Sequence, residues 1–191
     1  MINAPNIILV GPMGAGKTTI GRLISQSMGK EFYDLDKVIE DNAGADIPWI
    51  FEREGEEGFR KRETQALSNM VQSDTHNTVL ATGGGIVTRS ENRDILQQDG
   101  LVVYLYASVA QQLYRTSKSS HRPLLQAGDP KATLKKLFEV RDPLYREVAT
   151  LVIETDARHP KAVANKVLEA IKRYLTSEDS NPNAHLNRGS W

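Results

Sequence analysis

Short apolar runs recur along the chain, and most are followed by a stretch with helical periodicity. The runs at positions 7–10 and 101–105 consist almost entirely of Val, Ile and Leu. Runs of this length and β-branching are typical of parallel strands that are buried on both faces. We expect about five strands, with their centres at positions 7–10, 32–33, 78–82, 101–105 and 151–153.

Between these runs, the polar segments carry apolar residues at helical spacing. After the first run, one such face is formed by Ile20, Leu23, Ile24 and Met28. Pro143 is expected to interrupt or re-aim a later helix, because proline has no N–H to donate. We expect helices after position 17, around 37–40, from 47, and over 59–71, 88–97, 109–115, 132–140 and 160–175.

The alternation of strands and helices predicts an α/β fold. It implies a central five-stranded parallel sheet with right-handed crossovers and helices on both faces, which is a three-layer α/β/α arrangement. A chain of 191 residues suits a single domain, which we place at positions 1–175. Residues 176–191 are polar and have no periodicity, so we expect them to form a disordered tail.

Composition narrows the classes of function. The 24 basic and 24 acidic residues give a formal net charge of zero, which offers no support for a nucleic-acid or membrane partner. The chain has no cysteine, which excludes disulfides and thiolate metal sites. Its longest apolar run, 101–107, is too short to cross a bilayer, and no secretion signal is visible. We therefore expect a soluble, cytoplasmic protein.

Residues 11–18, Gly-Pro-Met-Gly-Ala-Gly-Lys-Thr, match the phosphate-binding loop (P-loop) pattern G-x-x-x-x-G-K-[ST]. A glycine-rich turn could match by chance, but this one lies between a predicted strand and a predicted helix. The glycines let backbone N–H groups turn inward beside the positive end of the helix dipole. Lys17 can then reach the β- and γ-phosphates of a nucleotide, and the Thr18 hydroxyl can bind Mg²⁺. The residues expected to bind ATP here are Gly14, Ala15, Gly16, Lys17, Thr18 and Thr19.

Two carboxylates follow the predicted strand at 32–33. Asp34 and Asp36 are two residues apart, so on an extended backbone they project to the same side. Ligands of open α/β sheets bind beyond the carboxyl ends of the strands. One carboxylate can therefore lie near the metal and the other near a hydroxylated substrate. Asp36 also suits the N-cap of the helix that follows, and the two roles are compatible.

Three other stretches hold candidate site residues. Gly83, Gly84 and Gly85 follow the strand at 78–82, where they permit positive φ and leave room for a ligand, although a loose turn would use glycine too. The charge-rich segment 52–63 is typical of a solvated helix face for most of its members. The polar segment at about 116–129 is typical of a mobile lid.

Taken together, six motifs in this order resemble those of shikimate kinase, a P-loop kinase of the nucleoside-monophosphate-kinase-like branch. The resemblance covers about positions 6–174. It implies ATP-dependent phosphorylation of the 3-hydroxyl of shikimate in aromatic amino-acid synthesis, with Mg²⁺ as cofactor. The motifs are the P-loop, Asp34-Leu35-Asp36, Phe59-Arg60, Gly83-Gly84-Gly85, Arg122-Pro123-Leu124-Leu125 and Arg141-x-Pro-Leu-Tyr145.

The resemblance also implies roles for single residues on the substrate side. Asp36 would hold the shikimate hydroxyls and orient or deprotonate the attacking one. Arg60 and Arg141 would clamp the carboxylate, and the backbone around Gly84 would close the pocket. Arg122, on the lid, would reach the transferring phosphate.

On the nucleotide side, the resemblance makes Thr18 a direct ligand of Mg²⁺ and places Asp34 near the ion through water. Arg158 falls in the stretch that contacts adenine. Catalysis would rest on Lys17, Asp36 and Arg122, and we expect a monomer. Two alternatives stay open. One is another kinase of this fold, for gluconate or a nucleoside monophosphate, and the other is a nucleotide-binding module without catalysis.

Overall fold

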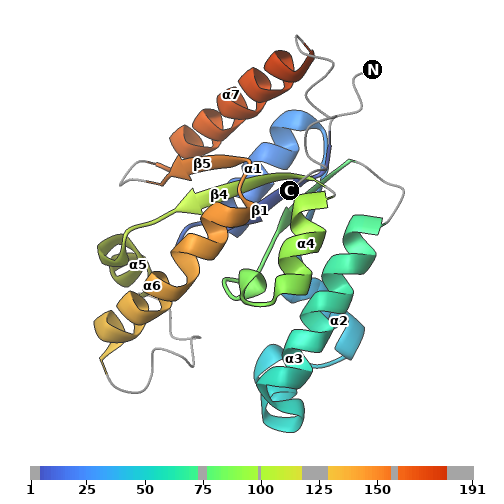
Figure 1. The fold of residues 1–191 in the computed structure, drawn as a ribbon, viewed down its shortest axis with the longest axis vertical. Helices are drawn as coiled ribbons and strands as arrows, with labels where there is room; N and C mark the ends of the chain where they lie inside the picture. Colours follow the sequence, from blue (N-terminus) through green and yellow to red (C-terminus); the bar gives the residue numbers. More distant parts are fainter. Residues whose placement is uncertain (1–4, 73–76, 99, 118–128, 156–158, 180–191) are drawn as a thin grey trace, which may run out of the picture.

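Five parallel strands form the centre of the computed structural model, which describes residues 5–72, 77–98, 100–117, 129–155 and 159–179 (Figure 1). Their order is β2-β3-β1-β4-β5, and every neighbouring pair runs parallel. The predicted parallel sheet of five strands is therefore confirmed. The strands are β1 Ile7–Val10, β2 Glu31–Asp34, β3 Thr78–Ala81, β4 Leu101–Tyr106 and β5 Leu151–Glu154.

Helices cover both faces of this sheet. Helices α1 and α7 pack on one face, while α3, α4 and α6 pack on the other (Figure 1). Among the described residues, no helix is both long and apolar enough to cross a membrane. The helices are α1 Lys17–Met28, α2 Leu35–Ala43, α3 Ile47–Gln72, α4 Ser90–Gln98, α5 Val109–Thr116, α6 Pro130–Val148 and α7 Pro160–Asp179, with a 3₁₀ turn at Ile86–Thr88.

Strand β1 contributes to both hydrophobic cores. Ile7 and Leu9 pack in the core beneath α1 and α7, whereas Ile8 and Val10 pack in the core beneath α3, α4 and α6. Successive side chains of a strand point to opposite faces, so a central strand needs apolar residues at every position. All four residues of β1 are buried, which explains its continuous apolar run.

The expected interruption at Pro143 is wrong, because α6 runs unbroken from Pro130 to Val148. Proline inside a helix removes one hydrogen bond and crowds the preceding turn. Tertiary contacts on both sides of Pro143 hold the helix here. Asp142 accepts a hydrogen bond from the Tyr104 hydroxyl at 2.7 Å, and the Tyr145 ring packs on the Tyr104 ring.

Two other boundaries differ from the expectation. The helices expected from 47 and over 59–71 join into α3, whose only non-helical residue is Gly55, with φ 71°. Helix α7 extends to Asp179, so the first four residues of the expected tail are helical. The hydroxyls of Thr176 and Ser177 donate to carbonyl oxygens of the preceding turn of this helix. Residues 180–191 lie outside the described part of the chain.

Candidate active site

The candidate site lies at the carboxyl ends of β1, β2 and β3, as the sequence predicts. Strand β1 leads into the P-loop, β2 into Asp34, and β3 into the glycine run, which we define as residues 83–85. Beyond the paired strands, the Thr82 amide donates to the Leu9 carbonyl oxygen at 3.1 Å. The P-loop and the glycine run therefore leave the sheet side by side.

The P-loop backbone requires its glycines. Gly11, Gly14 and Gly16 have φ values of 144°, 79° and 91°, which residues with a Cβ rarely adopt. At Gly11 a Cβ would also lie 2.5 Å from the Leu105 carbonyl oxygen. Helix α1 begins directly after this loop, at Lys17, so its first N–H groups face the space that the loop encloses.

Lys17 lies across the mouth of the P-loop. Its Nζ donates to the carbonyl oxygens of Gly11 at 2.7 Å and Pro12 at 2.9 Å. These bonds hold the ammonium group where the β- and γ-phosphates of a bound nucleotide would lie, because the helix N-terminus faces the same space. The predicted position of Lys17 is therefore consistent with the structure.

Thr18 and Asp34 form an oxygen pair beside the P-loop. The Thr18 hydroxyl donates to Asp34 Oδ2 at 2.7 Å. Mg²⁺ in phosphoryl-transfer sites takes one or two protein oxygens and completes its shell with water and substrate phosphates. Among the described residues, no group of three or more His, Cys, Asp or Glu side chains forms a metal cage. The Thr18 and Asp34 pair fits this open kind of Mg²⁺ site.

The helix cap is Asp34, and the expectation that Asp36 occupies this position is wrong. Asp34 Oδ1 accepts a hydrogen bond from the Asp36 amide at 3.2 Å, and α2 begins at Leu35. The strand ends at Asp34, so the two carboxylates do not lie on one extended backbone. They are still close, because the capping turn folds the first residues of α2 back toward the end of β2.

Asp36 is a half-buried carboxyl with an unusual protonation equilibrium. Burial, together with the neighbouring carboxylates of Asp34 and Glu63, raises the pKa of Asp36 to about 6, although Lys17 opposes this rise. Its Oδ1 lies 2.9 Å from the point where a Cβ on Gly83 would be. The missing side chain at Gly83 therefore leaves the room that Asp36 occupies.

Arg60 is held by a buried carboxylate that the sequence analysis missed. Its Nη1 donates to Glu63 Oε2 at 2.7 Å, and its Nη2 lies 3.4 Å from exposed Glu56. Glu63 is fully buried, and its Oε1 has no hydrogen-bond partner. Burial raises the pKa of Glu63, although Arg60 opposes this. At Gly85 a Cβ would lie 2.4 Å from both guanidinium nitrogens, so glycine makes room for Arg60.

Glu63 is an exception within segment 52–63, for most of whose members the sequence predicts a solvated helix face. Residues 52–57 are exposed as expected. Glu63, however, shares the inner face of α3 with Phe59, Ala66 and Leu67, which lie four residues before it and three and four residues after it. The sequence does carry a signal for this burial, because Glu63 stands at a position where the helical spacing predicts an apolar residue.

Arg141 and Tyr145 meet the glycine run from α6. The Arg141 guanidinium donates to the Gly84 carbonyl oxygen at 3.2 Å, and the Tyr145 hydroxyl donates to the same oxygen. The three glycines do not use the positive φ that glycine permits, because the positive-φ glycines of the described chain lie elsewhere. These glycines instead permit close approach. Asp36 lies against the first, Arg141 binds the second and Arg60 lies against the third.

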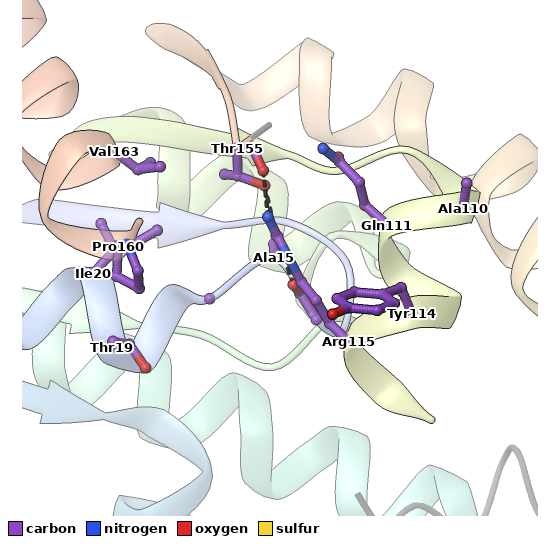
Figure 2. A pocket seen from close by; sticks show the side chains of 12 residues that line it. Ala15, Thr19, Ile20, Ala110, Gln111, Tyr114, Arg115, Thr155, Pro160 and Val163 are labelled. Carbon is purple, nitrogen blue, oxygen red and sulfur yellow. Dashed lines mark hydrogen bonds between the residues drawn. The ribbon is translucent and has the colours of Figure 1, made fainter. Parts of the chain in front are cut away.

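A pocket of about 670 Å³ opens on the other side of the P-loop (Figure 2). The loop, helix α5 and the start of α7 line it, with Gly14, Thr19, Tyr114, Arg115, Thr155 and Pro160 among its residues. Arg115 Nη1 donates to the Gly14 carbonyl oxygen at 3.0 Å and to the Thr155 hydroxyl at 2.9 Å. No local motif marks Arg115, Thr155 or Pro160, so the sequence does not predict that they line a pocket.

Two predicted site residues cannot be placed. Arg122, with residues 118–128 of the expected lid, and Arg158 lie outside the described residues. Helix α5 ends at Thr116, at the start of the expected lid, and helix α6 begins at Pro130, directly after it. The structure therefore brings together Lys17, Thr18, Asp34, Asp36, Arg60, Gly84 and Arg141, and leaves Arg122 and Arg158 as predictions.

Comparison with known proteins gives one consistent family. A family model described as "Shikimate kinase" matches residues 13–172. A shikimate kinase of Marinomonas sp. is 85% identical over 178 residues, which cover 93% of this chain and 98% of the relative. One of Psychrobacter sp. is 51% identical and covers 89% and 93%. A solved shikimate kinase from Acinetobacter baumannii in complex with shikimate has a TM-score of 0.85 and 51% identity, and covers 90% of this chain and 94% of that one.

Asp36→Asn is expected to raise the thermal unfolding midpoint at about pH 7.5 and to lose most of that gain at about pH 4. The pKa of folded Asp36, about 6, lies above its ordinary value of 3.8. The folded state therefore binds this proton more tightly than the unfolded state, and stability falls as pH rises from about 4 to about 6. Thermal unfolding at both pH values measures the effect.

Glu52→Gln is the matched control, because Glu52 is an exposed carboxylate. It should change the midpoint little at either pH. A gain for Asp36→Asn that is equal at both pH values would contradict a raised pKa.

Proposed function

The chain belongs to the shikimate kinase family, and from this we propose how its residues carry out the transfer of a phosphoryl group from ATP to the 3-hydroxyl of shikimate. One observation carries the proposal. The glycine run, which gathers Asp36, Arg60 and Arg141, lies against the P-loop, since a Cβ on Gly84 would be 3.5 Å from the Met13 amide nitrogen and 3.6 Å from the Gly11 carbonyl oxygen. An acid held at the glycine run is therefore next to a phosphate held in the P-loop.

On the nucleotide side, the P-loop amides and Lys17 bind the phosphates of ATP, with Gly14, Ala15, Gly16, Thr18 and Thr19 around them. The base and sugar extend into the pocket of about 670 Å³ beside the loop. A planar base fits between the Arg115 guanidinium and Pro160, because both line that pocket and a guanidinium stacks well on aromatic rings. Arg158, which precedes Pro160, remains a proposed contact of adenine.

On the acid side, Arg60 and Arg141 bind the carboxylate, because a planar guanidinium matches the two oxygens of a carboxylate. Glu63 holds Arg60 in place, at 2.7 Å. The half-buried carboxyl of Asp36 accepts hydrogen bonds from the ring hydroxyls. The Gly84 backbone closes the pocket toward the P-loop.

The Thr18 hydroxyl would hold Mg²⁺ directly, and Asp34 would hold it through water. When bound, it neutralises charge on the phosphate oxygens and helps to align the terminal phosphoryl group. The hydrogen bond between Thr18 and Asp34 places both oxygens in advance, which reduces the rearrangement needed on binding. Asp34 is the last residue of β2 and Thr18 lies in the first turn of α1, so the two oxygens meet beside the P-loop.

The chemistry requires alignment more than strong bases. A bond forms between the 3-oxygen of shikimate and the terminal phosphorus, while the bond from that phosphorus to the oxygen it shares with ADP breaks. The hydroxyl proton passes to the Asp36 carboxylate, whose pKa of about 6 suits this acceptor role near neutral pH. Lys17 stabilises the charge that develops on the phosphoryl oxygens. Arg122, from the expected lid, is proposed to act on the same oxygens, and closure of that lid would exclude water.

Every described residue in this proposal lies on one chain, so a monomer is sufficient to build both subsites. A kinase of the same fold with another acceptor is the main rival. A gluconokinase from Sinorhizobium meliloti has a TM-score of 0.61 but only 17% identity, which shows a shared fold alone. The arginine pair at the glycine run indicates an anionic acceptor, and the identity of that acceptor is decided by the test below.

An acceptor panel tests the proposal directly. ATP turnover, followed by ADP release, should depend on shikimate and should not respond to gluconate or to nucleoside monophosphates. Stimulation by one of those acceptors and not by shikimate would refute the proposed acid subsite. ATP binding without phosphorylation of any acceptor would favour a non-catalytic module.

Lys17→Ala is expected to lower kcat by about 10²- to 10³-fold, because the ammonium group acts on charge that develops in the transition state. Steady-state kinetics with saturating ATP and shikimate measures it. Lys37→Ala, which removes an exposed lysine paired with Asp41, should leave kcat unchanged. Near-normal kcat in Lys17→Ala, with an unchanged circular dichroism spectrum, would contradict the role of Lys17.

Arg60→Ala is expected to raise KM for shikimate by about ten- to a hundredfold and KM for ATP by less than about twofold, because a charged hydrogen bond to the carboxylate is lost. Arg62→Ala is the control, since Arg62 lies on the same helix and bonds to Glu54 at its Nε and Nη2. It should change neither constant. Equal losses for both substrates in Arg60→Ala would count against the carboxylate assignment.

A further inference from the structure

The Tyr145 side chain lies in the acid subsite, but none of the steps above uses it. Tyr145 is only 1% exposed, and its hydroxyl donates to the Gly84 carbonyl oxygen. Burial raises the pKa of Tyr145 far above the neutral range. The hydroxyl therefore keeps its proton and remains a hydrogen-bond donor at any pH at which the enzyme works.

The Gly84 carbonyl oxygen has two donors in this structure. Arg141 Nη1 donates to it at 3.2 Å, in addition to the Tyr145 hydroxyl. A carbonyl oxygen has two lone pairs, so both bonds can form at once. The same Arg141 is the side chain assigned above to the substrate carboxylate. The substrate carboxylate would therefore compete with the Gly84 carbonyl oxygen for the Arg141 guanidinium.

We propose that Tyr145 is a positioning residue for the acid, which keeps the Gly84 carbonyl hydrogen-bonded while Arg141 turns to the substrate carboxylate. This inference rests on the proposed role of Arg141. With the tyrosyl hydroxyl in place, Arg141 exchanges the Gly84 carbonyl oxygen for the charged carboxylate of the substrate, which is a stronger acceptor. The Gly84 carbonyl oxygen meanwhile keeps its bond to Tyr145. Without the hydroxyl, the same exchange would leave the half-buried Gly84 carbonyl oxygen without its two protein donors, which opposes binding.

The surroundings of Tyr145 prevent its hydroxyl from following Arg141. Its ring packs on the buried Tyr104 ring of β4, with ring centroids 4.9 Å apart and an angle of 30° between the planes. The Tyr104 hydroxyl in turn donates to Asp142 Oδ1 at 2.7 Å, and Asp142 Oδ2 accepts from Arg146 at 2.9 Å. The ring packing holds Tyr145 against β4 whether or not the Tyr104 hydroxyl is present, so the Tyr145 hydroxyl is a fixed donor.

Tyr145→Phe is expected to weaken shikimate binding about tenfold, because the carbonyl loses its remaining donor when Arg141 leaves it. Calorimetric titration of shikimate measures the Kd, and KM for shikimate should rise in parallel while KM for ATP does not.

Tyr104→Phe is the matched control. It removes a buried hydroxyl from the other ring of the same stacked pair, and that hydroxyl donates to Asp142 instead of Gly84. It should leave the Kd for shikimate unchanged, with a similar loss in thermal midpoint. Equal Kd values for the two variants would overturn the proposal.

A double-variant comparison separates this inference from the role assigned to Arg141. In Arg141→Ala protein there is no Arg141 to move, so adding Tyr145→Phe should not weaken shikimate binding further. An equal effect of Tyr145→Phe in both backgrounds would overturn the proposal and leave the carboxylate role of Arg141 standing. Unchanged shikimate affinity in Arg141→Ala alone would instead refute that carboxylate role.

A crystal of the wild-type enzyme with shikimate gives a test that needs no variant. Arg141 Nη1 should lie beyond about 3.5 Å from the Gly84 carbonyl oxygen, outside hydrogen-bond range, while the Tyr145 hydroxyl remains bonded to it. An Arg141 that binds the carboxylate and keeps its bond to Gly84 would overturn the proposal.

Discussion

The pairing of β1 with β3 is the constraint on which the two substrate subsites depend. The strands run parallel, and the bond from the Thr82 amide to the Leu9 carbonyl oxygen continues their pairing up to the two loops. As a result, the P-loop and the glycine run begin at the same level of the sheet. In-line transfer requires the donor and acceptor to be placed to within fractions of an ångström. Backbone hydrogen bonds in a buried sheet are a more rigid reference for this purpose than any contact between side chains.

The acid subsite concentrates charge in a small, partly dehydrated space, and this has consequences for stability. Asp36 and Glu63 both have raised pKa values because burial disfavours their ionised forms. Two arginines offset part of that penalty, and Glu63 still has one oxygen without a hydrogen-bond partner. Buried charges that are incompletely paired lower the stability of a fold, and proteins retain them in sites where binding requires them.

Local patterns predict the scaffold and the P-loop, because strand, loop and helix each have a signature within a few residues. The five strands and the placement of Lys17 and Thr18 follow from such patterns. Arg115 and the bond from Tyr145 to Gly84 do not, because they depend on contacts across 101 and 61 positions of sequence. Pro143 shows the converse case. A strong local signal for a break is overridden by packing that anchors the helix on both sides of the proline.

Tyr114 lies on the rim of the pocket beside the P-loop and is 68% exposed. The chain contains no thiol of its own. A cysteine placed at this position would accept a maleimide fluorophore at a single, known point, without first removing native reactive groups. The label would then report the arrival and departure of nucleotide in real time on an otherwise unaltered enzyme.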